Sequence, residues 1–416
     1  MRRLRVLLIT KVFPNAMQPE EAPFNRHQFA ALSRYCDVEV LATIPWFPGA
    51  ARFSKWPIAT GAPREEVIDG LPVRHPRFLY VPRIAQGLNG ALYAGSLVPE
   101  VALRCTTPDV IVGAFAYPDG CAAVCLGRLL RIPTVIKVHG TDIDVLPSRR
   151  AVARSLRWGL QRAARIVAVS HELAAGVEAL GVPRERIDVV MNGVHSHVFR
   201  PQDRVDARRR LGRAPERRTI LFVGQLVRDK GIFELIEVFQ GLASAHADLD
   251  LVLVGDGAEM QACRAAAKRL GGRLTVIGAR PHHEIADWMA ACDVLALPSR
   301  HEGTPNVVIE ALASGRRVVA TSVGGIPGLL HSEALGELVP PKDQAALAAA
   351  LARAAYEPYD AARVAATSGW RDWDHSARRL CEVLESVARP RCEQSAPARK
   401  DDQDSASRSH ISGAVL

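Results

Sequence analysis

The chain has 416 residues, of which 48% are hydrophobic and 23% are charged. That length exceeds one ordinary hydrophobic core, so two domains of similar size are expected, and the composition excludes a disordered or fibrous chain. Lysine and arginine number 53 against 44 acidic residues, giving a net charge of +9 that favours anionic partners such as phosphates or an acidic membrane face. Zinc-finger, basic-zipper and aromatic RNA-binding patterns are missing from the sequence, so nucleic acid is not expected as a partner.

The first residues superficially resemble a signal peptide. Their apolar run is only as long as a strand and is followed by Lys11 rather than a small-residue cleavage site. We therefore interpret residues 4–9 as the first buried strand, followed by a helix over 24–34 and a strand over 38–42. Residues 46–97 are rich in proline, glycine and aromatic residues and are expected to be irregular.

Short apolar runs then alternate with amphipathic segments, as in β-α-β units around a parallel sheet. In this part of the chain the predicted strands are 110–112, 134–138, 166–169 and 187–190, and the predicted helices are 119–130, 149–163 and 171–180. A charged segment with two prolines, 199–218, is typical of an interdomain connector.

A second series of the same kind follows this connector. Its predicted strands are 220–223, 251–254, 274–277, 294–297 and 318–321, and its predicted helices are 230–243, 258–270, 283–290, 306–313, 345–355 and 373–387. The tail, 389–416, is polar and lacks periodicity, so we expect it to be disordered. The fold class predicted is α/β, with two doubly wound domains and a cleft between them.

The most informative segment contains two carboxylates, Glu302 and Glu310, around a Gly-Thr-Pro-Asn turn that opens a helix. Thr304 or Asn306 is expected to cap that helix. Glu302 would lie at the carboxyl end of a strand, where ligands bind in open α/β sheets. A carboxylate can accept hydrogen bonds from sugar hydroxyl groups, and the free N–H groups at the start of a helix can bind a phosphate. Together they suggest a phosphorylated sugar as ligand.

Three other strand ends carry polar residues. Gly224 and Gln225 precede Arg228 and Lys230. The two positive charges could bind a diphosphate, or they could simply be two charged residues on the surface. Gly255-Asp256-Gly257 is explained by turn chemistry with Asp256 capping a helix, and Gly257 near the ligand is a secondary possibility. His139, followed by Gly140 and Asp142, ends a strand of the first domain and is expected to face the cleft.

Two further features admit two interpretations each. Tyr117 and Asp119 could line the same crevice, although helix capping by Asp119 explains them adequately. The arginine-rich segment 149–165 also contains Leu156, Trp158 and Leu160, so it could rest on anionic lipid, or simply be a solvated helix face.

Together these motifs resemble the GT-B glycosyltransferases of family 4, retaining enzymes that use nucleotide sugars. The resemblance extends to about residue 387 and is strongest from Pro298 to Thr321 and over Val323-Gly324-Gly325-Ile326-Pro327. It implies an acceptor-side Rossmann-like domain over 1–197 and a nucleotide-sugar-binding domain over 198–370. Residues 371–388 would form a helix packing back toward the first domain.

The resemblance also implies a role for each motif residue. Glu302, Lys230, His139 and Arg228 would be catalytic: Glu302 and His139 would contact the donor sugar and Lys230 would neutralise the diphosphate. The donor would further contact Gly224, Gln225, Gly257, Gly303, Thr304, Asn306, Val307 and, through its ribose, Glu310. Acceptor-side candidates are Asp142, Tyr117 and Asp119. No metal or other cofactor is expected, because Lys230 and helix dipoles supply positive charge.

Some positions depart from the family pattern. Gln225 stands where arginine is frequent, Gly328 where an acidic residue is common, and His195 where aspartate is usual after Asn192-Gly193-Val194. The leading hypothesis is a retaining hexosyltransferase that builds a polysaccharide or glycolipid. A nucleotide-sugar 2-epimerase on the same fold and an inactive sugar-nucleotide-binding partner are the alternatives. The cysteines form no Cys-x-x-Cys pair, which fits a reducing cytoplasm, with any membrane contact peripheral.

Overall fold

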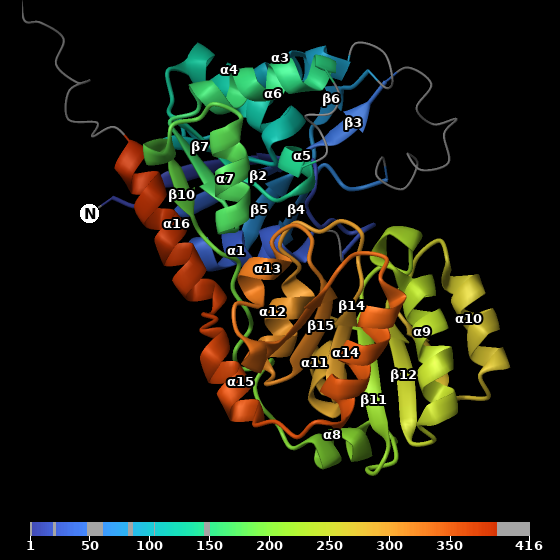
Figure 1. Cartoon of the computed structure of the whole chain (residues 1–416). Coiled ribbons are helices and arrows are strands. Elements are labelled where there is room, and N and C mark those ends of the chain that lie inside the picture. The colour runs from blue at the N-terminus through green and yellow to red at the C-terminus, as the bar shows by residue number, and fades with distance from the viewer. Residues whose placement is uncertain are drawn as a thin grey trace, which may run out of the picture.

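The computed structural model describes residues 2–19, 22–47, 61–81, 86–103, 105–144 and 150–388. These residues form two α/β domains, each built on a mainly parallel sheet (Figure 1). Among them, no helix combines the length and the apolar character needed to cross a bilayer.

The N-terminal domain contains an eight-stranded sheet in the order β10-β9-β8-β7-β1-β2-β5-β4. All neighbouring strands are parallel except the β4–β5 pair, which is antiparallel. The strands are β1 Arg5–Thr10, β2 Asp37–Ala42, β4 Glu65–Ile68, β5 Leu71–Arg74, β7 Val110–Ala114, β8 Thr134–Val138, β9 Arg165–Ala168 and β10 Ile187–Val189; β3 Ile44–Trp46 and β6 Arg77–Leu79 pair separately.

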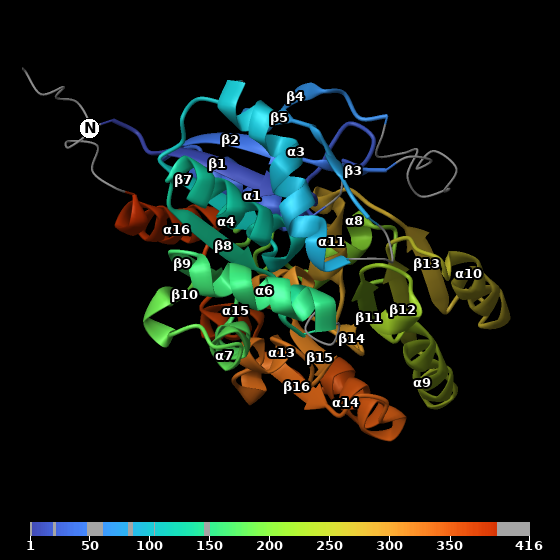
Figure 2. The same ribbon diagram turned by 90° about the horizontal axis from the view of Figure 1, so that it is seen from above.

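Both faces of this sheet are covered, which explains why its strands are continuous apolar runs rather than alternating ones. Val6 and Leu8 face a core shared with α1 (Pro23–Leu32) and α16 (Trp373–Val387), whereas Leu7 and Ile9 face α3 (Asn89–Leu103) and α4 (Cys121–Leu130). Helices α6 (Arg150–Arg162) and α7 (His171–Ala179) cover β8 and β9 on the α4 side (Figure 2). A short helix, α5 (Thr141–Asp144), follows β8.

The C-terminal domain contains a six-stranded parallel sheet in the order β13-β12-β11-β14-β15-β16. Its strands are β11 Arg218–Val223, β12 Leu249–Val254, β13 Leu274–Gly278, β14 Val294–Leu297, β15 Arg317–Thr321 and β16 Gly336–Val339. Its helices are α8 Arg204–Arg210, α9 Ile232–Ala245, α10 Met260–Arg269, α11 His282–Ala291, α12 Asn306–Ala313, α13 Ile326–Leu329, α14 Gln344–Tyr356 and α15 Ala361–Ser368.

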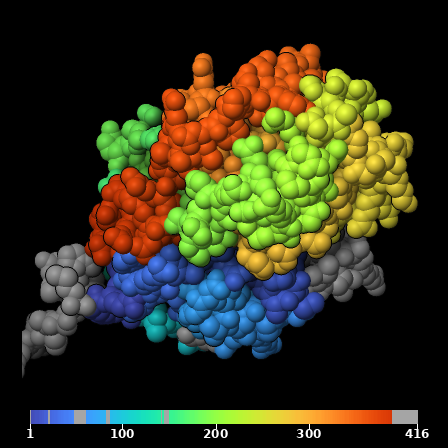
Figure 3. Space-filling view, turned by 90° about the horizontal axis from the view of Figure 1, so that it is seen from below, coloured from blue at the N-terminus to red at the C-terminus, as the bar shows by residue number. Residues whose placement is uncertain are grey.

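The chain passes between the domains twice, and the two passages lie side by side. Val194 forms a β-bridge with Asp372, and the Val194 N–H donates to the carbonyl of Arg371 at 3.1 Å. Beyond the second passage, α16 returns to the N-terminal domain and packs on α1, where Gln28 donates to the hydroxyl of Ser376 at 2.8 Å. Figure 3 shows the red C-terminal residues against the blue N-terminal ones on this face.

Two of the predicted segments have a different structure, and one prediction is not tested. Residues 46–97 are not wholly irregular, since they contain β4, β5, β6 and the start of α3. The segment 199–218 contains α8, whose Arg208 is buried against Asp293, so it is tied to the C-terminal domain. The expected disorder of 389–416 falls outside the described residues.

Candidate functional site

Lys230 and Glu302 form an ion pair on the C-terminal side of the cleft. The Nζ atom of Lys230 lies 2.7 Å from Oε1 of Glu302, and the Ser299 hydroxyl donates to the same oxygen at 2.7 Å. The Glu302 side chain is only 7% exposed, and that of Lys230 is 27% exposed. Because β11 and β14 are neighbours in a parallel sheet, the loops after them meet at one edge and bring these residues together.

The loops that hold this pair are fixed by backbone contacts. The Arg300 N–H donates to the carbonyl of Asp229 at 2.8 Å, and the Gly325 N–H donates to the carbonyl of Gly303 at 2.8 Å. Gly231 begins α9 with a φ of +68°, in the left-handed region that favours glycine. Lys230 therefore belongs to the tight turn before α9, not to the helix itself.

Helix α12 begins at Asn306 without a side-chain cap, so the prediction that Thr304 or Asn306 caps it is wrong. The Asn306 amide oxygen instead accepts from Asn192 of the other domain at 2.8 Å. Thr304 contributes a buried Oγ1 without a hydrogen-bond partner among the described residues, and Val307 is partly buried. One turn along the helix, Oε1 of Glu310 lies 2.7 Å from Nε2 of His282.

His139 lies on the opposite wall of the cleft, where its ring packs between two aromatic rings. The ring centroids of Phe115 and Phe24 are 4.5 Å and 4.7 Å from that of His139. Burial, with a smaller contribution from the charge of Lys137, holds the pKa of His139 well below its usual value, so the ring is neutral. Its Nε2 is buried and has no partner among the described residues, which leaves this atom able to hydrogen-bond a ligand.

Asp142 is a buried clamp for the loop that carries His139. Its carboxylate accepts backbone N–H groups from Ala116 at 2.8 Å, Gly140 at 2.9 Å and His139 at 3.1 Å. These three bonds hold the loop after β8 against the turn after β7. Burial raises the pKa of Asp142, and the same three hydrogen bonds oppose that shift. Among the described contacts Asp142 therefore positions His139.

The two walls touch at Gly140 and Gly303. A methyl group placed on Gly140 would lie 2.5 Å from Cα of Gly303, and one placed on Gly303 would overlap the carbonyl oxygen of His139. Real side chains do not tolerate such distances, so this contact requires glycine on both sides. The loop that carries His139 and the loop that carries Glu302 are therefore in direct backbone contact.

Two family models match the chain. The model described as "Glycosyl transferase 4-like domain" covers residues 22–193, and the one described as "Glycosyl transferases group 1" covers residues 217–356. TuaC of Bacillus subtilis, whose name assigns it to teichuronic acid biosynthesis as a glycosyltransferase, is 31% identical over 85% of this chain and 90% of its own length. The chain belongs to glycosyltransferase family 4.

Other relatives and solved structures agree with this assignment. A D-inositol 3-phosphate glycosyltransferase of Catenulispora acidiphila is 31% identical over 68% of this chain and 72% of its own length. HepE of Anabaena, solved with UDP, superposes with a TM-score of 0.70 at 20% identity, covering 92% of this chain and 100% of that one. Sucrose-phosphate synthase of Thermosynechococcus elongatus gives 0.64 at 20% identity over 93% and 95% of the two chains. The structures establish the GT-B fold.

The remaining donor-side candidates of this family 4 glycosyltransferase lie around the loops after β11 and β12. Gln225 is exposed, and Arg228 is 70% exposed on its side chain and pairs with Glu259 at 2.9 Å. A methyl group on Gly255 would overlap the carbonyl of Gly224, and one on Gly257 would lie 2.5 Å from the carbonyl oxygen of Leu226. These glycines allow the two loops to pack closely.

Asp256 does not cap α10, contrary to the sequence prediction, because that helix begins only at Met260 and its N-cap is Glu259. The carboxylate of Asp256 instead accepts the Gly257 N–H at 2.7 Å, within the turn itself. The turn needs three further residues before the helix starts, which places Asp256 too early in the chain to reach the first helical N–H groups.

Two acceptor-side candidates are buried within the N-terminal domain. The Tyr117 hydroxyl donates to the carbonyl of Gln86. The sequence predicts that Asp119 caps α4, and it does not. Asp119 lies in a separate helical turn before that helix, and its carboxylate accepts the backbone N–H of Lys11. Burial raises the pKa of Asp119 to about 7, and its Oδ2 has no partner among the described residues.

Helix α6 directs its apolar side chains inward. Val152, Leu156 and Leu160 are buried in the core of the domain, while the arginines at 150, 154, 157 and 162 are exposed. The outer face is therefore basic and lacks the apolar stripe with which amphipathic helices enter lipid. Contact of this face with a membrane would be electrostatic and stays a prediction.

Sequence reasoning missed the rings that surround the functional side chains. Phe24 lies on α1 and Phe115 directly follows β7, and no local motif pairs either residue with His139. His27 and His282 were also missed, although His282 directly contacts the Glu310 carboxylate. His27 and His282 are partly buried and lie on separate segments, so the sequence gives no spacing signal that would group them.

Proposed function

We propose that the protein is a retaining hexosyltransferase that binds a nucleoside diphosphate sugar on its C-terminal domain and an acceptor glycan on its N-terminal domain. The observation that carries the proposal is the Lys230–Glu302 pair, 2.7 Å apart, opposite a neutral His139 with an unpartnered Nε2. A cation and a carboxylate in contact, with a neutral imidazole on the loop that touches Gly303, would suit a diphosphate bound to a polyhydroxylated ring.

Lys230 would change partner during binding. In this structure, Lys230 and Ser299 both donate to Oε1 of Glu302. A diphosphate entering the turn before α9 would draw the ammonium group toward its negative charge, while Glu302 would accept hydroxyl protons of the sugar. Since both groups are largely removed from water, each interaction is stronger than it would be on the surface.

The transfer itself would proceed by cleavage of the bond from the anomeric carbon to the phosphate oxygen and formation of a bond to the acceptor oxygen on the same face. The acceptor proton would pass to the departing phosphate. Lys230 would stabilise the charge that grows on this leaving group, which is the main catalytic contribution we assign. With that charge supplied by a side chain, we propose that the transfer needs no metal ion at the diphosphate.

The relatives support the substrate classes in this proposal. HepE of Anabaena has been solved with UDP-glucose, and the name of TuaC assigns that protein to a polysaccharide pathway. We therefore propose a nucleoside diphosphate hexose as donor and a growing polysaccharide or glycolipid as acceptor. Seven free cysteines among the described residues support a cytoplasmic location, and the arginines of α6 support transient contact with anionic lipid.

The proposal is tested by screening the purified full-length chain against a panel of nucleotide sugars and measuring release of nucleoside diphosphate with and without glycan acceptors. Lys230→Met and Glu302→Gln are expected to lower kcat by about 10²–10³. Lys268→Met is the matched control, because Lys268 is an exposed lysine on α10. Equal activity of Lys230→Met and Lys268→Met would refute the donor-site assignment.

The stereochemistry is read from the anomeric proton coupling of the first product formed. Retention is expected, and an inverted product would refute the retaining mechanism while leaving the donor site in place. Conversion of the donor to its 2-epimer without any acceptor would identify the epimerase alternative instead.

A further inference from the structure

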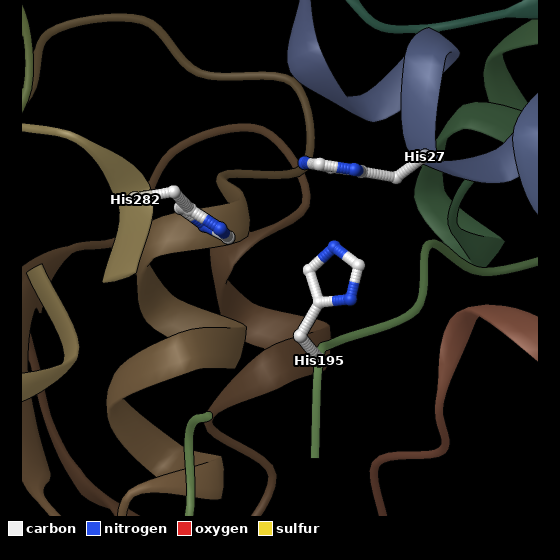
Figure 4. Close-up of side chains that lie close together, drawn as sticks. All are labelled: His27, His195 and His282. Carbon is white, nitrogen blue, oxygen red and sulfur yellow. The ribbon is translucent and has the colours of Figure 1, made fainter. Parts of the chain in front are cut away.

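Three histidines from separate parts of the chain meet beside the passage between the domains. His27 lies on α1 of the N-terminal domain, His195 follows Val194 in the first passage, and His282 begins α11 of the C-terminal domain. Figure 4 shows the three rings directed toward a common space from these three segments. The ring centroids are 4.4 Å apart for His27 and His195, 5.5 Å for His27 and His282, and 5.7 Å for His195 and His282.

The geometry is close to that of a metal site. One ring nitrogen from each histidine lies within 4.8 Å of the other two. Around a tetrahedral zinc ion with bonds of about 2.0–2.1 Å, ligand nitrogens are about 3.4 Å apart. The nitrogens would therefore approach by up to about 1.4 Å, which side-chain rotations can supply because all three residues are only partly buried.

The cluster consists of imidazoles in the form that binds metal. Burial, together with repulsion between the neighbouring protonated rings, lowers the pKa of His27 to about 3 and that of His195 to about 4. Arg26 does not oppose a cation strongly, because its guanidinium is paired with Asp69 at 2.6 Å. Neutral histidines keep the lone pair that coordinates a metal.

Glu310 supplies the supporting carboxylate. Its Oε1 lies 2.7 Å from Nε2 of His282, and metal-binding histidines characteristically give their second ring N–H to such a group. A cavity of about 440 Å³ opens onto His27 and His195 and is lined also by Asp69 and Trp373. An ion could thus reach His27 and His195 from solvent, and a water or ligand could take a fourth position.

We propose that His27, His195 and His282 form a Zn²⁺ site that bridges the two domains of this glycosyltransferase. Zinc suits the site because three imidazoles with one open position are an established coordination set for this ion, whereas Mg²⁺ and Ca²⁺ require oxygen ligands. The ion would join α1 to α11 across the cleft. This role differs from the charge neutralisation that we assign to Lys230, and it rests on the geometry of the three histidines and the contact of His282 with Glu310.

The site is tested by titrating the full-length chain, stripped with a chelator and free of any affinity tag, with ZnCl₂ in a calorimeter. One ion per chain is expected. His27→Ala and His195→Ala should each weaken binding at least about tenfold, and Glu310→Gln about 10–100-fold. His283→Ala is the matched control, since His283 is exposed on the same helix as His282 but lies outside the cluster.

Cobalt provides a second measurement that does not depend on variant stability. Titration of the wild-type protein with Co²⁺ should produce the intense visible bands of a four-coordinate ion, and equimolar Zn²⁺ should abolish them. Absence of stoichiometric Zn²⁺ binding, or equal loss of affinity in His283→Ala and His27→Ala, would overturn the proposal. Because the readout is metal binding, failure here leaves the donor site standing, and failure of the donor site leaves this one standing.

Discussion

Substitution of Gly303 by alanine should separate the two walls of the cleft without disturbing either domain. The added methyl group would overlap the His139 carbonyl oxygen and lie 3.1 Å from Cα of Gly140. Gly303 has no left-handed φ, so alanine adds no backbone strain there. The overlap therefore arises only from the contact between domains.

The size of the effect follows from the same contact measured from the Gly140 side. A methyl group on Gly140 would be 2.5 Å from Cα of Gly303, whereas non-bonded carbons prefer about 3.5–4.0 Å. The walls must therefore part by about 1 Å. A misplacement of that size can lower catalysis about 10²-fold, which corresponds to about 2.7 kcal/mol of transition-state stabilisation.

The assay compares kcat/KM for donor turnover with the affinity for the nucleoside diphosphate alone. We expect kcat/KM of Gly303→Ala to fall about 10²-fold, because His139 no longer reaches the donor. Nucleotide affinity should change less, since the nucleotide binds to the C-terminal domain. Small-angle scattering should report a larger radius of gyration, and the free energy of unfolding should change by less than about 1 kcal/mol.

Two controls separate domain contact from other effects of adding a methyl group. Gly241→Ala introduces the methyl group into open space on α9. Gly140→Ala should reproduce the catalytic defect, but it also adds backbone strain because its φ is +135°. Gly212→Ala, at φ +65° in open space, shows the smaller cost of alanine in the left-handed region without any domain contact. If Gly303→Ala turned over donor within about threefold of Gly241→Ala, the closed arrangement would not be the catalytic one.

Three further substitutions test the physical basis of the fold. Lys137 is buried in the core, which lowers its pKa to about 7 from 10.5. Between these two pH values the unfolded chain holds the Lys137 proton and the folded chain does not, so the free energy of unfolding should rise with pH over that window. Lys137→Met should abolish this rise and should raise the urea midpoint most at or below pH 7, whereas the control Lys268→Met should do neither. Asp293→Ala should cost about 3–5 kcal/mol in urea unfolding by leaving buried Arg208 without its carboxylate, and the exposed Asp287→Ala less than about 1 kcal/mol. Asn306→Ala should leave the Asn192 amide without its partner across the domain boundary. The melting temperature in calorimetry should fall by a few degrees, corresponding to about 1–2 kcal/mol of stability; an unchanged melting temperature would show that the Asn192–Asn306 hydrogen bond contributes nothing.

The sequence predicted the elements whose signal is local. Strand β14 and helix α12 coincide with the predicted ranges 294–297 and 306–313, because a short apolar run and a helical period with a preceding proline are both visible in the chain. Helix α3 was missed, since Pro99 lies inside it and glycines interrupt its period. Packing of Tyr93 and Leu97 against the sheet supplies the stability that propensity does not.

In the candidate site, too, the sequence predicts what depends on local signals and misses what depends on tertiary packing. Lys230 and Glu302 could be placed together because strand ends of a parallel sheet share one edge, and the structure brings their charged atoms to 2.7 Å. The pairing of Glu310 with His282 could not be anticipated, since it depends on how α11 begins relative to α12. The aromatic surroundings of His139 likewise depend on α1, whose position is set by tertiary packing.

The neighbouring passages at Val194 and Asp372 have a consequence for how the enzyme handles its substrates. Two bodies joined along a single edge, here paired by backbone hydrogen bonding, have one easy relative motion, a rotation about that edge. Any ligand that touches both walls must select the same rotated state. Donor and acceptor would then raise each other's affinity by the same factor without contacting one another, so their cooperation would follow from a mechanical constraint rather than from any residue that recognises both.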